Sequence, residues 1–569
     1  MQKKLKLLFF FFKQIDDKNK SKLILLIFLI SISSFLEFLS IGSIIPLLSS
    51  LLQFNNLDNK NYFYSILSLM NLNNKNLKFL IFVFIVIIIS SSLFRILVLR
   101  YTIKTSSLII SQISSKMFGH IIYQPYDIFI TNESNALIGG ITQKINALHS
   151  FILNLLYLIS GIFLSIGILL ALIFYNIQVT FLILTVLLSF FIFISFFISK
   201  KIDEFSKKNS YFVNKRIKFL QETIGSIKEI ILNFAHQKIL KLFDTNEKNY
   251  RLVDYKISFL TSFPRILVEA FGITFLLLIS LFYFNFSNNN EILLTLGVFS
   301  YAANRLLPII NGGYQSWAIL SGNYYFFKDI SEIFSSKNEK KLDNYERSNK
   351  IYQFLKLENL SFSHLNKTKK VFNGINLKIP LESKKIAVVG PTGIGKSTFL
   401  NLITGLLRPS SGKIFLDGQN LENETLQHWQ SQLAYVSQNI FLLNDTIKNN
   451  ITFPDDPEAI SKDRLNEAIK LVNIESFVEN LEKKLETIIG EDGKNISGGQ
   501  KQRIGLARAL YKKKKILLLD EATNNLDYLT EEKIFTNILN CSYISTIIMI
   551  THRKENLDKF DIIIDLDKI

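Results

Sequence analysis

The stretch that decides the fold of the second half of the chain reads Gly390-Pro391-Thr392-Gly393-Ile394-Gly395-Lys396-Ser397-Thr398. It follows the apolar run Lys385–Val389, opens a helical pattern and has the spacing G-x-x-x-x-G-K-[ST]. Glycines at these positions let backbone N–H groups surround an anion, and the helix that follows adds positive potential. Lys396 is then expected to reach the β- and γ-phosphates, and the Ser397 hydroxyl to hold Mg²⁺. A chance Gly-rich turn is disfavoured because both flanking elements are present, so the sequence predicts nucleoside triphosphate binding.

An acidic motif lies downstream of this phosphate loop. The run Lys515–Leu519 is typical of a buried strand and is followed by Asp520 and Glu521. Asp520 is expected to bind Mg²⁺, directly or through water, and Glu521 to act as general base on the attacking water. An apolar run that ends in Asp-Glu is weak evidence alone, but it gains weight from the phosphate loop in the same part of the chain.

A second anion-binding turn is predicted between these two motifs. The segment Asn495–Gln500 contains a Ser-Gly-Gly turn, and a helical pattern follows at Ile504–Leu510. One domain has no need for two γ-phosphate sites. Two copies do need them if each Ser-Gly-Gly turn closes over the phosphate loop of the other copy, which predicts a homodimer.

The composition changes sharply along the 569 residues. Apolar runs fill 1–330, whereas 351–569 is typical of a soluble domain and 331–350 of a linker. The predicted fold class is therefore multi-domain, with an all-α transmembrane domain followed by an α/β P-loop NTPase domain. Runs of spanning length predict six transmembrane helices at about 23–53, 77–103, 148–175, 177–199, 255–286 and 291–325.

The charges are placed as in a membrane protein. Lysines are frequent before the first apolar run, which indicates a cytoplasmic N-terminus, and six spans would return the chain to the cytoplasm. A net charge of +18 could indicate nucleic acid, but this placement and a Lys-, Asn-, Ile- and Phe-rich composition argue against that partner. The one cysteine, Cys541, excludes an intramolecular disulfide and fits a reducing cytosol.

The connections between the spans differ in length. The inner ones, about 104–147 and 200–254, are long and polar, which would be explained by helices that continue into the cytoplasm. The first outer connection holds the apolar and aromatic stretch Tyr62–Met70, which is too short to span. An interfacial helix at the outer leaflet and a packed loop are both open interpretations of it.

Three arginines fall within predicted spans, namely Arg95, Arg265 and Arg305. An ionisable group in hydrocarbon is costly and usually faces a partner or a cavity. Glu37 and Glu269 are candidate partners in structural ion pairs. The other interpretation is a positively charged cavity for an anionic substrate, and the excess of Arg over Glu favours it.

The chain resembles an ATP-binding cassette (ABC) exporter half-transporter over nearly its whole length. Ser497–Gln500 is similar to the signature of that family, Gln438 to its Q-loop glutamine and His552 to its switch histidine. The resemblance implies ATP and Mg²⁺ as cofactors, with catalytic residues Glu521, His552 and Gln438 and with Ser397, Gln438 and Asp520 as metal ligands. The implied ATP-binding residues are Gly390, Thr392, Gly393, Gly395, Lys396, Ser397, Thr398, His364, Ser497, Gly498, Gly499 and Gln500.

The chain departs from the family pattern at a few positions. His364 stands where the family stacks adenine on a tyrosine, and an imidazole offers less surface for stacking. Asn495-Ile496 precedes the signature where Leu is usual, and Asn524-Asn525 stands where Ser-Ala is common. No implied catalytic residue is missing, so both sites of a homodimer are expected to hydrolyse ATP.

Within this family the chain most resembles the lipid-linked oligosaccharide flippases of bacterial N-glycosylation (the PglK type). The resemblance is carried by Ser262–Glu269, Asn304–Pro308 and Phe94-Arg95. It implies that Arg95, Arg265 and Arg305 bind an anionic polyprenyl-pyrophosphate-linked oligosaccharide and that the substrate moves from the cytoplasmic to the outer side of a bacterial inner membrane. Export of a lipid A-like lipid, a peptide or a hydrophobic compound, and a regulator that transports nothing, remain as alternatives.

Overall fold

The computed structural model describes residues 12–52, 77–131, 134–284, 289–322, 330–331, 334, 352–364, 370–382, 384–551 and 554–569. The chain divides into two compact units. The first unit comprises Met1–Gln124 and Asn132–Asn338, and the second comprises Pro125–Thr131 and Glu339–Ile569. Most of the predicted linker, 331–350, lies outside the described residues.

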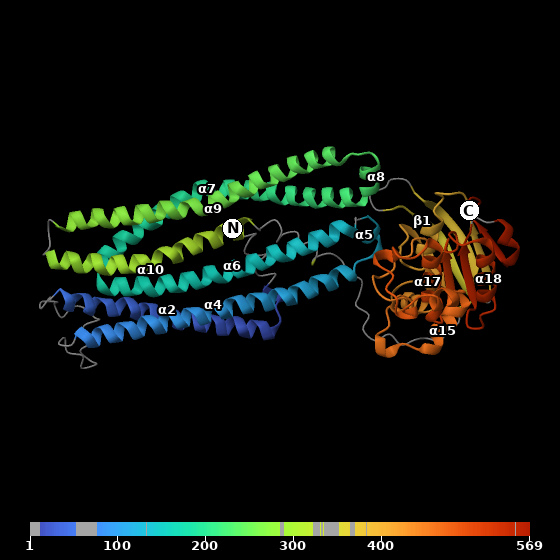
Figure 1. Cartoon of the computed structure of the whole chain (residues 1–569), viewed down its shortest axis with the longest axis horizontal. Helices are drawn as coiled ribbons and strands as arrows, with labels where there is room; N and C mark the ends of the chain where they lie inside the picture. Colours follow the sequence, from blue (N-terminus) through green and yellow to red (C-terminus); the bar gives the residue numbers. More distant parts are fainter. Residues whose placement is uncertain are drawn as a thin grey trace. The chain divides into compact units, whose positions relative to one another are not determined.

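The first unit is built from helices, which lie side by side in Figure 1. The described helices are α2 (Asp17–Leu51), α4 (Leu77–Ile122), α6 (Ser134–Tyr175), α7 (Ile177–Gly225), α8 (Ile227–Leu232), α9 (His236–Phe284) and α10 (Asn289–Gly322). Helix α2 packs on α4 and α6, α6 also packs on α10, and α7 packs on α9. One apolar core joins α2, α6 and α10 through Ile41, Ile168 and Val298, all of which are fully buried.

Five helical segments of the described residues are long and apolar enough to cross a membrane: Asp17–Leu51, Leu77–Ile122, Lys144–Tyr175, His236–Phe275 and Leu293–Gly322. The predicted span 177–199 lies within α7, where the apolar segment found, Ile177–Val186, is shorter. A helical transmembrane domain is therefore confirmed, whereas the number of six spans stays a prediction.

Several helices run past the predicted spans. Helix α4 continues to Ile122, α7 continues to Gly225, and α9 already begins at His236. The long inner connections are therefore largely helical, as predicted. The short apolar stretch Tyr62–Met70 lies outside the described residues.

Helices α2 and α6 approach each other closely at a glycine. The Ser34 hydroxyl donates a hydrogen bond to the Phe163 carbonyl over 2.5 Å. A Cβ atom on Gly167 would lie 2.6 Å from Ser34 Oγ, which is inside van der Waals contact. The close approach of α2 and α6 therefore depends on glycine at this position. Small residues are common at helix contacts within membranes.

The second unit contains two sheets. A five-stranded parallel sheet has the order β6-β7-β8-β3-β9, with β3 (Lys385–Val389), β6 (Leu433–Val436), β7 (Ile516–Asp520), β8 (Thr546–Ile550) and β9 (Ile562–Asp565). A four-stranded antiparallel sheet has the order β2-β1-β4-β5, with β1 (Phe354–Phe362), β2 (Phe372–Pro380), β4 (Ser411–Leu416) and β5 (Gln419–Asn420). The α/β prediction is confirmed, whereas the antiparallel sheet was not predicted.

Helices accompany these sheets: α12 (Lys396–Ile403), α13 (Asn423–Ser431), α14 (Ile447–Thr452), α15 (Lys462–Leu471), α16 (Glu475–Glu479), α17 (Gly498–Tyr511) and α18 (Tyr528–Leu539). The short α5 (Tyr126–Thr131) belongs to this unit although the first unit surrounds it in sequence. Strands β7 and β8 are buried along their whole length, as central parallel strands are. Ligands of such sheets bind at the carboxyl ends of the strands, where β3 and β7 lead into the two predicted motifs.

Candidate functional site

The phosphate loop joins the end of β3 to the start of α12. Its glycines Gly390, Gly393 and Gly395 have φ angles of 149°, 86° and 108°, which L side chains rarely adopt. A Cβ atom on Gly395 would also lie 3.2 Å from the Phe372 ring. The loop conformation therefore depends on glycine, as an anion-binding loop of backbone N–H groups requires.

Lys396 is folded back onto its own loop. Its ammonium donates hydrogen bonds to the carbonyls of Gly390 at 2.9 Å and Pro391 at 3.1 Å, and the residue is only 6% exposed. Burial lowers the pKa of Lys396, while the carboxylates of Glu521 and Asp520 act in the opposite direction. The ammonium is thus held inside the loop and close to both carboxylates.

Ser397 and Asp520 are brought together at the junction of α12 and β7. The Ser397 hydroxyl donates to Asp520 Oδ1 at 3.1 Å, and the Tyr435 hydroxyl donates to Oδ2 at 3.2 Å. Burial raises the pKa of Asp520, and both hydrogen bonds counteract it. A hydroxyl oxygen beside a buried carboxylate suits Mg²⁺, which prefers oxygen ligands. The residues therefore fit the predicted ion. Tyr435 is a further partner of Asp520 that local motif spacing does not indicate.

Glu521 follows β7 and has a positive φ of 50°. Its Oε2 atom accepts hydrogen bonds from the side-chain amides of Gln438 at 2.7 Å and Asn524 at 2.9 Å. The structure thus joins two predicted residues, Gln438 and Glu521, by a direct contact. Asn524 stands where Ser is common in the family, and its place three residues after Glu521 is the signal that could have indicated this contact.

The Ser-Gly-Gly turn caps helix α17. The Ser497 N–H donates to Gln500 Oε1 at 2.8 Å, and the Gln500 N–H donates to Ser497 Oγ at 3.3 Å. This reciprocal capping box fixes the start of the helix. A Cβ atom on Gly499 would lie 3.2 Å from the Asn525 carbonyl, so glycine lets the turn approach that segment closely.

The remaining predicted residues are placed as follows. The His364 ring packs edge-on against Phe362, with 5.0 Å between the ring centroids. Burial raises the pKa of Asp127 in α5, while the nearby charges of His364 and Arg408 lower it. Helix α5 therefore lies within electrostatic reach of the residue expected to stack on adenine. His552 lies outside the described residues.

In the first unit, Arg95 and Arg305 share one buried carboxylate. Glu37 Oε1 accepts hydrogen bonds from Ser91 Oγ at 3.1 Å, from Arg95 Nη1 at 3.2 Å and from Arg305 Nη1 at 3.4 Å. Arg305 also donates to the Tyr301 hydroxyl at 3.1 Å. We call Glu37, Ser91, Arg95, Tyr301 and Arg305 the Glu37 cluster.

Arg265 has a separate partner. Its Nε donates to Glu269 Oε1 at 2.9 Å, and the Asn311 amide donates to the same oxygen at 3.1 Å. All three arginines are thus ion-paired, with the two carboxylates that the sequence offered as candidates. The ion-pair interpretation describes the structure, and substrate binding by these arginines stays a prediction.

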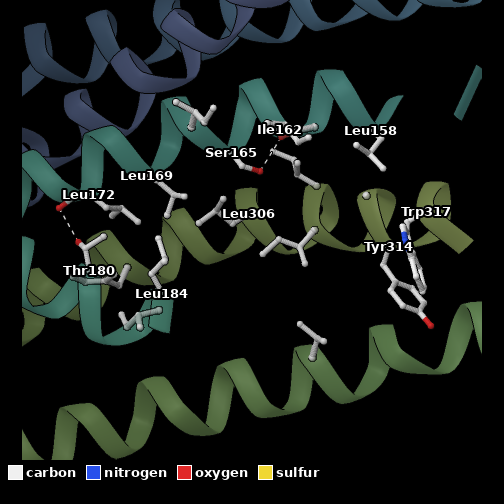
Figure 2. Close-up of a pocket in the computed structure, with 18 residues that line it drawn as sticks. Leu158, Ile162, Ser165, Leu169, Leu172, Thr180, Leu184, Leu306, Tyr314 and Trp317 are labelled. Carbon is white, nitrogen blue, oxygen red and sulfur yellow. Dashed lines mark hydrogen bonds between the residues drawn. The ribbon is translucent and has the colours of Figure 1, made fainter. Parts of the chain in front are cut away.

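An apolar cavity of about 530 Å³ lies in the first unit between α6, α7, α9 and α10. Figure 2 shows Leu158, Ile162 and Leu169 of α6 opposite Leu306, Tyr314 and Trp317 of α10. The Ser165 and Thr180 hydroxyls in its lining are engaged in hydrogen bonds to backbone carbonyls. The wall is therefore suited to hydrocarbon, and the three predicted arginines do not line it.

Both halves of the chain match known families. The model of the ABC transporter transmembrane region matches residues 23–303, and the model described as ABC transporter matches 372–524. The ATP-dependent lipid A-core flippase of Haemophilus ducreyi is 27% identical over 479 residues, which cover 81% of this chain and 79% of that protein. A bacterial Atm1-family ABC exporter with ATP bound shares the fold, with a TM-score of 0.79 and 17% identity, and the match covers 96% of this chain and 94% of that one. The chain is an ABC exporter half-transporter.

Further relatives of the ABC exporter extend this finding. The lipid A-core flippase of Shigella flexneri is 29% identical over 81% of the ABC exporter and 78% of the relative. That of Salmonella paratyphi A is 39% identical over 210 residues, which cover 37% of the ABC exporter and 36% of the relative. The ABC exporter is thus a multi-pass membrane protein whose ATPase domain couples ATP hydrolysis to transport. The relatives named here are not of the bacterial N-glycosylation type, so that finer resemblance stays a prediction.

Proposed function

We propose that this ABC exporter is a homodimeric, ATP-driven flippase that moves an anionic lipid from the cytoplasmic to the outer side of a bacterial inner membrane. The observation that carries this proposal is the similarity to lipid A-core flippases along about four-fifths of both chains. The apolar cavity supports it, because its walls offer hydrocarbon chains a matching surface. The arginines of α4, α9 and α10 offer forked hydrogen bonds to phosphate.

Two classes of lipid are candidates. A lipid A-core-like glycolipid is favoured by the relatives, and a polyprenyl-pyrophosphate-linked oligosaccharide is favoured by the segments around Arg95, Arg265 and Arg305. Both combine phosphate groups and sugars with long apolar chains. The apolar cavity and the arginines suit either one, whereas an uncharged hydrophobic compound would leave the arginines with only their ion-pair role.

The nucleotide site supports a two-copy cycle. Lys396 and Ser397 of one copy would hold ATP together with the Ser497 turn of the other copy, and Glu521 would accept the proton of the attacking water. Mg²⁺, when bound beside Ser397 and Asp520, would neutralise charge on the phosphates. Gln438 would hold the Glu521 carboxylate in place, as its 2.7 Å hydrogen bond suggests.

Two short segments would transmit closure of the ATPase domains to the membrane helices. One is Pro125–Thr131, which belongs to the second unit. The other is the turn at Asn233–His236, where Phe234 is 88% exposed and Leu232 just before it is 76% exposed. Such exposed apolar side chains at a helix turn favour docking onto a protein surface.

Transport by reconstituted protein tests the proposal. Proteoliposomes would contain either a fluorescent polyprenyl-pyrophosphate oligosaccharide or a fluorescent lipid A-core, and the ATP-dependent change in label accessibility would be compared for wild type and Arg265→Ala. Translocation of one substrate, weakened in Arg265→Ala while basal ATPase survives, would assign the substrate class. ATP hydrolysis without translocation of either lipid would refute the proposed function.

A further inference from the structure

The Glu37 cluster lies deep within the first unit. At about 1.5 Å per residue, Glu37 is about 21 Å from the end of α2 at Leu51. Arg95 is likewise about 27 Å from the start of α4 at Leu77, and Arg305 about 24 Å from the start of α10 at Asn289. All three charges thus lie at similar depth, far from the ends of their helices that are predicted to face outward.

The charges of the cluster do not balance. Two guanidiniums face one carboxylate, because Arg95 and Arg305 both contact Glu37. The ions carry a net charge of +1, and an uncompensated charge inside hydrocarbon is costly. The cluster is therefore one anion short of neutrality.

The geometry leaves the arginines capable of binding that anion. Their bonds to Glu37, at 3.2 and 3.4 Å, exceed the roughly 2.7–2.9 Å of a tight charge-assisted hydrogen bond. The Glu37 side chain is 0% exposed, whereas those of Arg95 and Arg305 are 36% and 17% exposed. The carboxylate is thus fully buried, whereas part of each arginine side chain remains accessible, and each guanidinium carries five N–H donors.

We propose that Glu37 sets the affinity of this membrane site for the phosphate of a transported lipid. The lipid identity of the ligand rests on the proposed function. Glu37 acts as a positioning residue: it holds Arg95 and Arg305 together and neutralises one of their two charges. A bound phosphate then faces a net charge of +1 rather than +2, so it is held weakly enough to dissociate. Without the Glu37 charge, the site would hold phosphate more strongly.

Lipid binding to the purified full-length protein tests this role. Native mass spectrometry would measure binding of dioleoyl phosphatidic acid, with dioleoyl phosphatidylcholine and inorganic phosphate as separate arms. Glu37→Gln is expected to tighten phosphatidic acid binding by at least about tenfold, the order expected when a unit charge roughly 7 Å away is removed at an effective dielectric constant of about 20. Arg95→Gln and Arg305→Gln are expected to weaken it.

The chain offers a matched control in Glu247. This carboxylate also contacts two arginines, Arg216 at 3.4 Å and Arg251 at 2.8 Å, but it lies outside the predicted spans. Glu247→Gln should leave phosphatidic acid binding unchanged. If inorganic phosphate at equal concentration displaces phosphatidic acid, the phosphate site is supported, but its ligand is then a free anion rather than a lipid.

A double variant keeps the proposal testable if Glu37→Gln does not fold. Glu37→Gln combined with Arg305→Gln retains a net charge of +1 and is expected to bind more tightly than Arg305→Gln alone. Folded Glu37 variants that bind phosphatidic acid no more tightly than their Glu37-containing counterparts would overturn the role of Glu37. Wild type that binds as expected but translocates no lipid would instead refute only the proposed function.

Discussion

At the scale of single residues, the assignment of Glu521 as general base gives the most specific prediction for the nucleotide site. Two amides, from Gln438 and Asn524, donate to its Oε2 atom. Glu521→Gln keeps the shape of the side chain but removes the base that accepts a proton from water. We expect ATP turnover to fall by about 10²–10⁴-fold, measured as phosphate release by the reconstituted protein.

A control for this variant lies in the same domain. Glu532→Gln changes an exposed carboxylate that contacts Lys559 at 3.4 Å, and such surface pairs contribute little. Its turnover should match wild type. Robust turnover in Glu521→Gln would contradict the assignment of Glu521 as general base.

The residues differ in how well the sequence could predict them. Lys396, Ser397 and Asp520 follow from local spacing, because a phosphate loop and a strand end are short contiguous motifs. The pairing of Arg95 with Arg305 on one carboxylate could not be predicted, because these residues and Glu37 lie on three helices. Hydropathy and spacing identify buried charges, but helix packing decides which of them meet.

At the scale of secondary-structure elements, the contact between α2 and α6 depends on the lack of a side chain at Gly167. Gly167→Ala would place a Cβ atom 2.6 Å from Ser34 Oγ. We expect a destabilisation of about 1–3 kcal/mol, seen as a lower midpoint of thermal unfolding in detergent, because the helices would have to move apart.

Gly119→Ala in α4 is the matched control. A Cβ atom there would meet nothing within 4 Å among the described residues, and alanine favours helix. Its unfolding midpoint should be unchanged or slightly higher. Equal midpoints for the two variants would show that the α2–α6 spacing adapts without cost.

The presence of the helices could be predicted more readily than the residues at which they begin and end. The hydropathy of α4, α7 and α9 marks only the apolar part of each helix, whereas the helices continue through polar residues, which hydropathy does not register as helical. The antiparallel sheet of β1, β2, β4 and β5 was not predicted. The pairs β1–β2 and β4–β5 join strands that are neighbours in the sequence, but the pairing of β1 with β4, which unites them into one sheet, is distant in sequence and leaves no local pattern.

At the scale of the whole molecule, the proposed homodimer predicts that catalytic sites are shared between copies. Lys396→Ala and Ser497→Arg should each abolish ATPase activity alone. Mixed dimers of the two variants contain one intact composite site out of two, so the purified mixed dimers should show about half of wild-type activity if the sites act independently. Purification through two different tags, followed by phosphate-release measurements, checks this.

A different pairing controls for nonspecific rescue. Lys396→Ala mixed with Glu521→Gln places one defect in each site, so no activity should return. If mixed dimers of Lys396→Ala and Ser497→Arg also show no ATPase activity, the prediction that each site combines residues of both copies is wrong.

Because the chain is synthesised from its N-terminus, the segment Pro125–Thr131 is made long before most of the unit to which it belongs. This segment belongs to the second unit, most of which is encoded after residue 339. At typical synthesis rates of about 5–20 residues per second, the roughly 440 residues that follow Thr131 take on the order of 20 to 90 s to appear. For that interval α5 exists without the rest of its unit, so the second unit cannot complete its folding until the C-terminal part of the chain has been synthesised.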